Sequence, residues 1–165
     1  MSTPIKKLDL ISSFEVYDSE NQLPASDKNL LETAKKALTA AYAPYSNFFV
    51  GAAVLLENGQ IVIGNNQENA AYPSGLCAER VAIYHAGAQY PGVPVKAIAV
   101  SCKAQNQVIN DPVTPCGACR QAIAEYENRY EQKIRIIMAG QSGNVYVTDS
   151  IESLLPLMFN RKYLK

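Results

Sequence analysis

Three cysteines and one glutamate have the types and the spacing that could do chemistry. Cys77 and Glu79 stand two residues apart in LCAERVAIYHAG, and Cys116 and Cys119 form a C-x-x-C pair in TPCGACRQ. Zinc prefers four tetrahedral ligands, and a catalytic zinc site has three protein ligands with a fourth position open to water. The three cysteines can supply such a ligand set, which predicts one zinc ion per chain.

Each cysteine taken alone has a simpler explanation. A C-x-x-C pair can be a thiol redox pair, and a single buried cysteine such as Cys77 is often a small core residue. Cys102 lies inside an apolar strand segment and is predicted to be a core residue. His85, the one histidine, lies two helical turns beyond Cys77 and is predicted not to bind the metal. The combination of three thiols, rather than any one of them, favours a metal site.

Both cysteine motifs fall where a helix is expected to begin. Free backbone N–H groups and the positive end of the helix dipole lower the pKa of a thiol there, which favours the thiolate that zinc binds. Three thiolates on a divalent ion leave a net charge of about minus one, so a positive group is expected nearby. Arg80, one turn after Cys77, is predicted to donate to sulfur. Arg120, directly after Cys119, could do the same or face solvent.

Glu79 stands on the same first turn as a predicted metal ligand. Its simpler explanation is a first-turn carboxylate that suits the helix dipole. Attack by water, however, needs a proton carrier within hydrogen-bond reach, and a carboxylate two residues from a ligand can reach the open position. With zinc, Glu79 predicts hydrolytic attack at an electrophilic carbon.

The composition restricts the class of protein. The chain has 165 residues, of which 48% are hydrophobic and 18% charged, and its formal net charge is zero. These values fit a single globular domain and argue against a nucleic acid polymer or a membrane surface as partner. No segment has the roughly 20 apolar residues of a spanning helix, and the start shows no signal-peptide pattern. We therefore expect a cytoplasmic protein with reduced thiols.

The hydrophobic pattern predicts an α/β fold. A helix is expected from Ser26 or Asp27, either of which can cap it, to Pro44. Hairpin strands follow at about 49–56 and 61–63, around Asn58-Gly59, where both turn residues would take positive φ. Further helices are expected at about 77–90, 116–130 and 150–155, and further strands at VKAIAVSC, KIRIIMA and 144–147.

These elements predict a three-layer α/β/α arrangement, with one mixed β-sheet of about five strands flanked by helices. The later strands are expected to be parallel neighbours. We expect one domain over residues 1–165, in which residues 1–25 form an N-terminal extension of unknown role with one possible short strand at 14–17.

Several segments together resemble one enzyme family. C-A-E at 77–79 with P-C-x-x-C at 115–119 is similar to the signature of zinc nucleobase deaminases, and the cysteine form points to cytidine deaminases. PYSNFFVGAA, G-x-N-x-E-N-A, AYPSGLCAER, PCGACRQ and LLPLMF also resemble cytidine deaminase segments, in the family's order. The resemblance covers about Leu30 to Phe159.

The resemblance implies hydrolytic deamination of free cytidine and deoxycytidine to uridine and deoxyuridine with release of ammonia, a step of pyrimidine salvage. It implies that Glu79 moves a proton from the attacking water to ring N3. It also implies a set of substrate-binding residues: Phe48 near the base and sugar, Asn66 and Glu68 at the ribose 3′-hydroxyl, the backbone of Ala78 and Pro115 at the pyrimidine edge, and Ala70, Tyr72 and Phe159 in a neighbouring subunit's pocket. The resemblance further implies a homotetramer whose composite sites would include the last three residues.

Other readings share part of this pattern. A deaminase of a blasticidin-type nucleoside antibiotic would have the same zinc core, but the N-x-E-N-A segment argues against it. A polynucleotide-editing deaminase lacks support because no basic stretch with interleaved aromatic residues is present. A non-catalytic zinc-stabilised protein would close the fourth ligand position with a side chain. The sequence does not rank cytidine against deoxycytidine.

Overall fold

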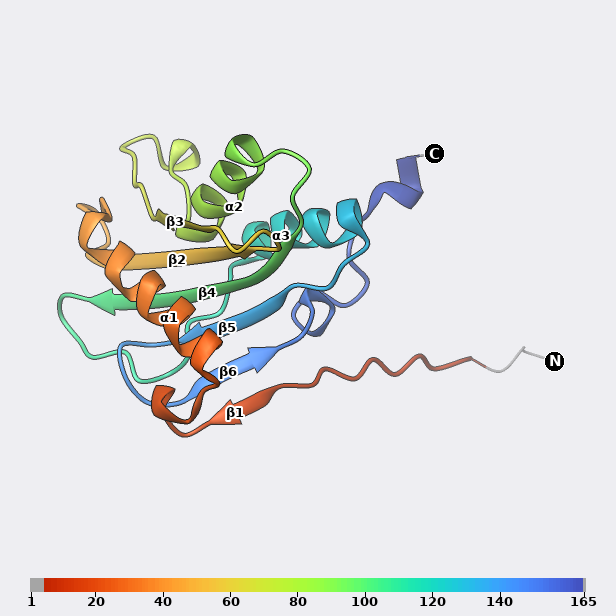
Figure 1. Cartoon of the computed structure of the whole chain (residues 1–165), viewed down its shortest axis with the longest axis horizontal. Helices are drawn as coiled ribbons and strands as arrows, with labels where there is room; N and C mark the ends of the chain where they lie inside the picture. Colours follow the sequence, from red (N-terminus) through yellow and green to blue (C-terminus); the bar gives the residue numbers. More distant parts are fainter. Residues whose placement is uncertain (1–4, 165) are drawn as a thin grey trace.

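The computed structural model of the chain describes residues 5–164 and shows a three-layer α/β/α arrangement (Figure 1). One six-stranded mixed sheet, in the order β1-β6-β5-β4-β2-β3, lies between α1 on one face and α2 and α3 on the other. The strands are β1 Glu15–Tyr17, β2 Phe48–Leu56, β3 Ile61–Asn65, β4 Val95–Ala104, β5 Arg135–Ala139 and β6 Val145–Thr148. The helices are α1 Ala25–Ala37, α2 Ala78–Gln89 and α3 Gly117–Tyr130. The predicted fold class is confirmed.

Strand β1 raises the number of strands above the predicted five. It falls within the N-terminal extension and pairs antiparallel with β6, with Val16 opposite Tyr146. The later strands are parallel only in part, because β4 and β5 pair in parallel whereas β5 and β6 pair antiparallel. A three-residue strand is too short to show a hydrophobic period, so its pairing could not be predicted from its own residues.

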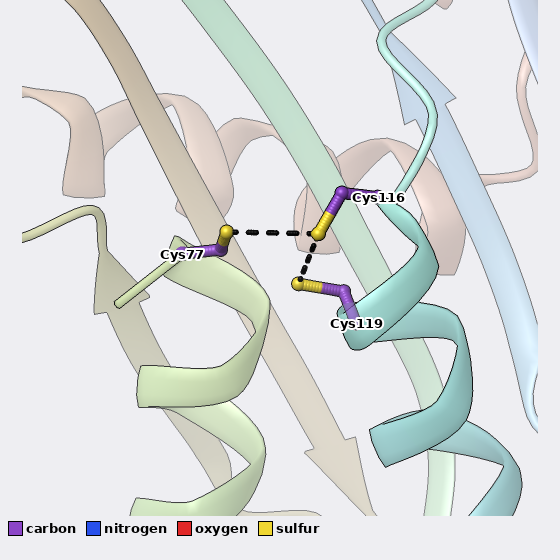
Figure 2. Close-up of side chains that lie close together, drawn as sticks. All are labelled: Cys77, Cys116 and Cys119. Carbon is purple, nitrogen blue, oxygen red and sulfur yellow. Dashed lines mark hydrogen bonds between the residues drawn. The ribbon is translucent and has the colours of Figure 1, made fainter. Parts of the chain in front are cut away.

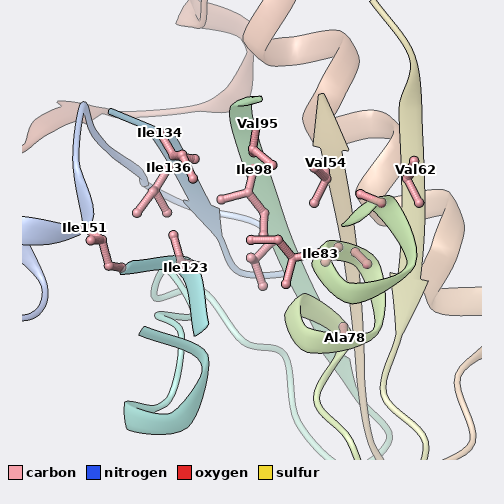
Figure 3. Packing of buried hydrophobic residues seen from close by; sticks show 14 of the residues in the cluster. Val54, Val62, Ala78, Ile83, Val95, Ile98, Ile123, Ile134, Ile136 and Ile151 are labelled. Atoms are coloured by element: carbon pink, nitrogen blue, oxygen red, sulfur yellow. The ribbon is translucent and has the colours of Figure 1, made fainter. Parts of the chain in front are cut away.

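Two hydrophobic clusters lie on opposite faces of the sheet. In β4, Ala97 and Ala99 pack in the cluster with α1, whereas Ile98 and Val100 pack in the cluster with α2 and α3. Successive side chains of a strand point to opposite faces, so a strand that is apolar throughout can join two helical layers. Figure 3 shows the larger cluster, where Ile83 of α2 and Ile123 of α3 meet the sheet.

Helix α1 buries the face that its periodicity predicts, including Leu30, Leu31 and Ala34. Its predicted cap is wrong, because the residue at the N-cap position is Pro24 rather than Ser26 or Asp27. Asp27 is buried inside the first turn and accepts a hydrogen bond from Arg135 Nε at 2.9 Å. The carboxylate thus has a cationic partner from β5, which single-sequence capping rules do not anticipate.

Two further local predictions differ from the structure. In the β2–β3 hairpin only Gly59 has positive φ, at 82°, because the last paired residues are Leu55 and Ile61 and the connection is longer than a two-residue turn. Asn58 instead accepts a hydrogen bond from the Gln60 amide. The predicted final helix is reduced to a 3-10 turn at Ile151–Ser153. Among residues 5–164, no helix has both the length and the apolar character needed to cross a membrane.

Candidate active site

The predicted metal ligands meet where α2 and α3 begin side by side (Figure 2). Cys77 is the N-cap residue of α2, Cys116 is the N-cap residue of α3, and Cys119 lies in the first turn of α3. The Sγ atoms of Cys77 and Cys116 are 3.7 Å apart, and those of Cys116 and Cys119 are 3.5 Å apart. All three ligand atoms lie within 4.8 Å of one another.

This spacing fits one tetrahedral zinc ion. A Zn–S bond of about 2.3 Å places two sulfurs of a tetrahedron about 3.8 Å apart. In the part of the chain that the structure describes, these cysteines are the group of three potential ligands found close enough to share one ion. A fourth protein ligand is not among them, so the cluster has the composition of a site with an open position rather than of a closed structural site.

The pKa values of Cys77 and Cys119 shift in opposite directions because the two thiols contact each other. Hydrogen bonding from Cys119, supported by Arg80, lowers the pKa of the Cys77 thiol to about 5. The same contact to Cys77, together with burial, raises the pKa of Cys119. Arg80 Nη2 lies 3.8 Å from Cys77 Sγ, where it can offset the negative charge of bound thiolates.

Glu79 is buried beside the cluster, with 4% of its surface exposed. Its Oε2 atom has no hydrogen-bond partner among the described residues, and burial raises the pKa of its carboxyl to about 6. An unpaired buried carboxylate oxygen is costly and needs an explanation. A pKa near neutrality suits a group that takes up and releases a proton during a reaction.

A cavity of ≈ 600 Å³ opens onto the metal cluster and Glu79. Its volume lies in the range of small-molecule sites. It is lined by Ser46, Phe48, Val50, Asn66, Gln67, Glu68, Tyr72, Gly75, Leu76, Cys77, Glu79, Arg80, Val113, Thr114 and Cys116. The chain thus brings segments from β2, the 66–76 loop and both helix starts to one space.

Asn66 and Glu68 line this cavity from the loop that follows β3. The Asn66 amide accepts from the Val50 amide and donates to the Phe48 carbonyl, both at 2.8 Å, so it fixes the start of β2. Glu68 accepts from the Tyr45 amide at 2.8 Å, from the Ser46 amide at 3.2 Å and from the Ser46 hydroxyl. The Ser46 hydroxyl bond holds the pKa of Glu68 below its usual value, which keeps a negative charge in the cavity wall.

Four of the predicted substrate-binding residues do not line this cavity. Ala70 is exposed in the loop, and Ala78 is buried as the first residue of α2. Phe159 is 55% exposed and stacks on Tyr163, with ring centroids 5.6 Å apart. The Pro115 carbonyl accepts a hydrogen bond from Arg120 Nε at 2.8 Å.

Cys102 and His85 were predicted not to bind the metal. Cys102 is fully buried in β4, and His85 is exposed on α2. Neither belongs to the metal cluster.

Sequence reasoning missed two residues that line the cavity, Ser46 and Thr114. Ser46 holds Glu68, and Thr114 lines the wall next to Cys116. Arg120 was predicted either to donate to sulfur or to face solvent, and among the described residues it instead makes its side-chain hydrogen bonds to oxygen atoms. Ser46 and Thr114 lie inside or beside the quoted motifs, but a lone hydroxyl residue in a loop carries no specific signal.

Gly64 of β3 lets α2 approach the sheet closely enough to place Cys77 and Glu79. A Cβ atom at this position would lie 2.4 Å from the Ala82 amide nitrogen and 2.6 Å from the Ala78 carbonyl oxygen. Both are backbone atoms of the first two turns of α2, so a side chain there would displace the helix.

Paired helix starts on one face of a mixed sheet, with three thiols and a buried carboxyl around a cavity, define a class of zinc-binding α/β protein. The model of the cytidine and deoxycytidylate deaminase zinc-binding region matches residues 24–132. This chain belongs to that family.

Named relatives are similar over most of their length. The cytidine deaminase of Sporosarcina psychrophila is 41% identical over 138 residues, which is 83% of this chain and 93% of the relative. The crystal structure of cytidine deaminase from Burkholderia pseudomallei has a TM-score of 0.69 and 41% identity, covering 79% of this chain and 97% of that one. The cytidine deaminase structure from Mycobacterium tuberculosis has a TM-score of 0.62 and 30% identity, covering 80% and 95%.

Proposed function

We propose that this chain is a zinc-dependent hydrolase that converts cytidine and deoxycytidine, with water, to uridine and deoxyuridine and ammonia. One observation carries the proposal: a single cavity is lined by Cys77, Cys116 and Glu79, and the buried Oε2 of Glu79 has no hydrogen-bond partner among the described residues. Cys77, Cys116 and Cys119 would hold the ion. When bound, zinc would act as a Lewis acid that makes a water molecule more acidic. The names of the relatives support cytidine as the substrate.

Glu79 carries the protons in this proposal. Its carboxylate takes a proton from the attacking water and delivers it to ring N3 as the water oxygen bonds to C4. The second proton of that water goes to the 4-amino nitrogen, which leaves as ammonia while the C4 carbonyl forms. A carboxyl with a pKa of about 6 can exchange protons in both steps near neutral pH.

Charges in the cavity wall favour a nucleoside over a nucleotide. Arg80 is the cation among the lining residues, and its guanidinium lies against Cys77 Sγ. The other charged side chains in the wall are Glu68 and Glu79, which would repel a phosphate. A 5′-phosphate would therefore find no free cation among the lining residues.

The substrate contacts form a second part of the proposal. Glu68 would accept from the ribose 3′-hydroxyl and Asn66 would donate its remaining amide hydrogen, while Phe48 packs beside the base and sugar. Such a polar site rejects analogues that lack the hydroxyl, because its groups would be left unpaired. The Ala78 amide and the Pro115 carbonyl are proposed to meet the pyrimidine edge, with the carbonyl sharing its second lone pair.

The last part of the proposal concerns the oligomeric state, the cellular location and the metabolic role. We propose one deaminase domain over residues 1–165, assembled as a homotetramer with composite sites. The exposed Ala70, Tyr72 and Phe159 would each reach a neighbouring subunit's cavity. A role in pyrimidine salvage in the cytoplasm agrees with four cysteines that form no disulfide.

A substrate panel tests the proposal. Purified, zinc-loaded protein is incubated with cytidine, deoxycytidine, cytidine 5′-monophosphate, blasticidin S and adenosine, and ammonia and the deaminated product are measured. We expect turnover of the two free nucleosides and at least about tenfold lower kcat/KM for the nucleotide. Preferred turnover of blasticidin S would support the alternative deaminase, and no turnover of any pyrimidine would overturn the proposal.

A further inference from the structure

Arg120 of α3 joins three parts of the chain that meet beside the metal cluster. Its Nε donates to the Pro115 carbonyl at 2.8 Å, and its Nη1 donates to the Leu154 carbonyl at 2.8 Å. Its Nη2 lies 3.4 Å from the Thr114 hydroxyl. The side chain thus links the residues just before Cys116 to the segment after the Ile151–Ser153 turn.

The loop before Cys116 depends on these contacts. Residues 105–116 join β4 to α3 without regular structure. Among the described residues, all hydrogen bonds to Thr114 and Pro115 come from Arg120. The proline has no N–H to donate, so its carbonyl is its one backbone hydrogen-bonding group.

The loop carries groups whose positions matter. Cys116 is the most exposed of the three cysteines, and its sulfur lies within 3.7 Å of both others. Thr114 and Cys116 both line the cavity. The Cys116 sulfur keeps its distance to the other two sulfurs only if the exposed end of the 105–116 loop is fixed by other parts of the chain. The hydrogen bonds of Arg120 to this loop can fix it.

We propose that Arg120 is a positioning residue that fixes Thr114, Pro115 and Cys116, so that it slows metal loss and orders the cavity wall without touching sulfur or substrate. A guanidinium presents several N–H donors in a fixed plane, and lysine cannot reproduce that arrangement. The inference concerns the site of the proposed function, but its metal-binding part holds whatever the substrate is.

Gln121 provides a matched control. It stands next to Arg120 on α3 and also holds the C-terminal segment, because its Nε2 donates to the Phe159 carbonyl at 2.9 Å. Among residues 5–164, its side chain makes no hydrogen bond to the loop before Cys116. Removing either side chain loosens the C-terminal segment, but only removal of Arg120 should loosen the loop.

The experiment compares Arg120→Ala, Arg120→Lys and Gln121→Ala in the full chain. Each zinc-loaded protein is mixed with a chromogenic chelator below its melting temperature, and zinc release is timed. We expect release from Arg120→Ala to be about 10- to 100-fold faster than from the unaltered protein. Arg120→Lys should lie between the two, and Gln121→Ala within twofold of the unaltered protein.

Kinetics and chemical rescue separate positioning from general destabilisation. With cytidine, kcat of Arg120→Ala should fall about tenfold or more, and added guanidinium ion at millimolar concentration should restore part of kcat and slow zinc release. Equal rates of zinc release from Arg120→Ala and Gln121→Ala would overturn the inference. If Arg120→Ala does not fold, a rate of zinc release from Arg120→Lys equal to that of the unaltered protein would also overturn it. Absence of cytidine turnover in the unaltered protein would count against the proposed function and leave the zinc-release result intact.

Discussion

At the scale of single residues, Glu68 offers the sharpest test of how the sugar is held. Its carboxylate accepts hydrogen bonds only, and a glutamine would turn a donor toward the Ser46 hydroxyl or the substrate. We predict that Glu68→Gln lowers kcat/KM for cytidine by about tenfold or more, the cost of one charged hydrogen bond.

The matched substrate for this variant is 3′-deoxycytidine, which lacks the hydroxyl that Glu68 would bind. The two proteins should differ less than about threefold with this analogue, because the interaction is absent in both. An equal loss for both substrates would show that Glu68 supports the loop at Tyr45 and Ser46 without contacting the sugar.

The three cysteines could be picked out from the sequence because zinc binding restricts both residue type and spacing. The convergence of Cys77 with Cys116 and Cys119 follows from that restriction, and the structure places their sulfurs together. The role of Arg120 could not be predicted, because its partners are carbonyl oxygens of distant residues such as Leu154. Backbone acceptors leave no trace in the sequence.

At the scale of elements, the contact between β3 and α2 decides where Cys77 and Glu79 lie. We predict that Gly64→Ala destabilises the fold by about 1–3 kcal/mol, because the new methyl group meets backbone atoms of α2 that cannot rotate away. The displaced helix start should also bind zinc more weakly. Thermal unfolding and zinc titration would measure both effects.

Gly117→Ala is the control, since it adds the same methyl group to the start of the other cysteine helix, where nothing lies within 4 Å. It should leave the melting temperature unchanged or slightly raised. Similar losses from both substitutions would contradict a specific role for the β3–α2 contact.

Helices and central strands could be predicted because their hydrophobic periods are long enough to be distinct. The long apolar segment of β4 indicates a strand buried on both faces, and α1 buries its predicted stripe. The hairpin turn and the last helix were predicted less well. Each depends on how the chain pairs with distant elements rather than on local preference.

At the scale of the whole molecule, Arg135 fastens the N-terminal extension to the domain. It forms ion pairs with Glu15 of β1 at 2.6 Å, with Asp27 of α1 at 2.9 Å and with Asp149 after β6 at 2.5 Å. These ion pairs connect β1, α1 and β5. Together with the β1–β6 pairing, they explain how β1, which lies outside the residues matched by the family model, is attached to the domain.

The cluster predicts a pH-dependent contribution to stability. The hydrogen bond from Arg135 holds the pKa of Glu15 below its usual value. The contribution is therefore fully present above the unfolded-state pKa of about 4.3 and is lost as pH falls through the lower folded-state pKa. At pH 7, Glu15→Gln should lower stability by about 1 kcal/mol or less, because Glu15 is largely exposed to screening solvent.

Urea unfolding of both proteins between pH 7 and pH 3 tests this prediction. The difference between them should shrink as the pH falls and should vanish near the acid end. The same substitution at Glu131, whose partner Arg161 is exposed, should have no measurable effect. A difference that grows toward low pH would contradict the assigned direction of the Glu15 shift.

The central claim is that three cysteines hold one zinc ion next to a carboxyl that moves protons. The most direct measurement determines zinc content and ammonia release from cytidine in the same preparations of the unaltered protein and of Glu79→Gln. We predict one zinc per chain in both, with kcat lowered by at least about hundredfold in the variant. Cytidine turnover that persists at the unaltered rate in Glu79→Gln, or that proceeds fully without zinc, would contradict the account.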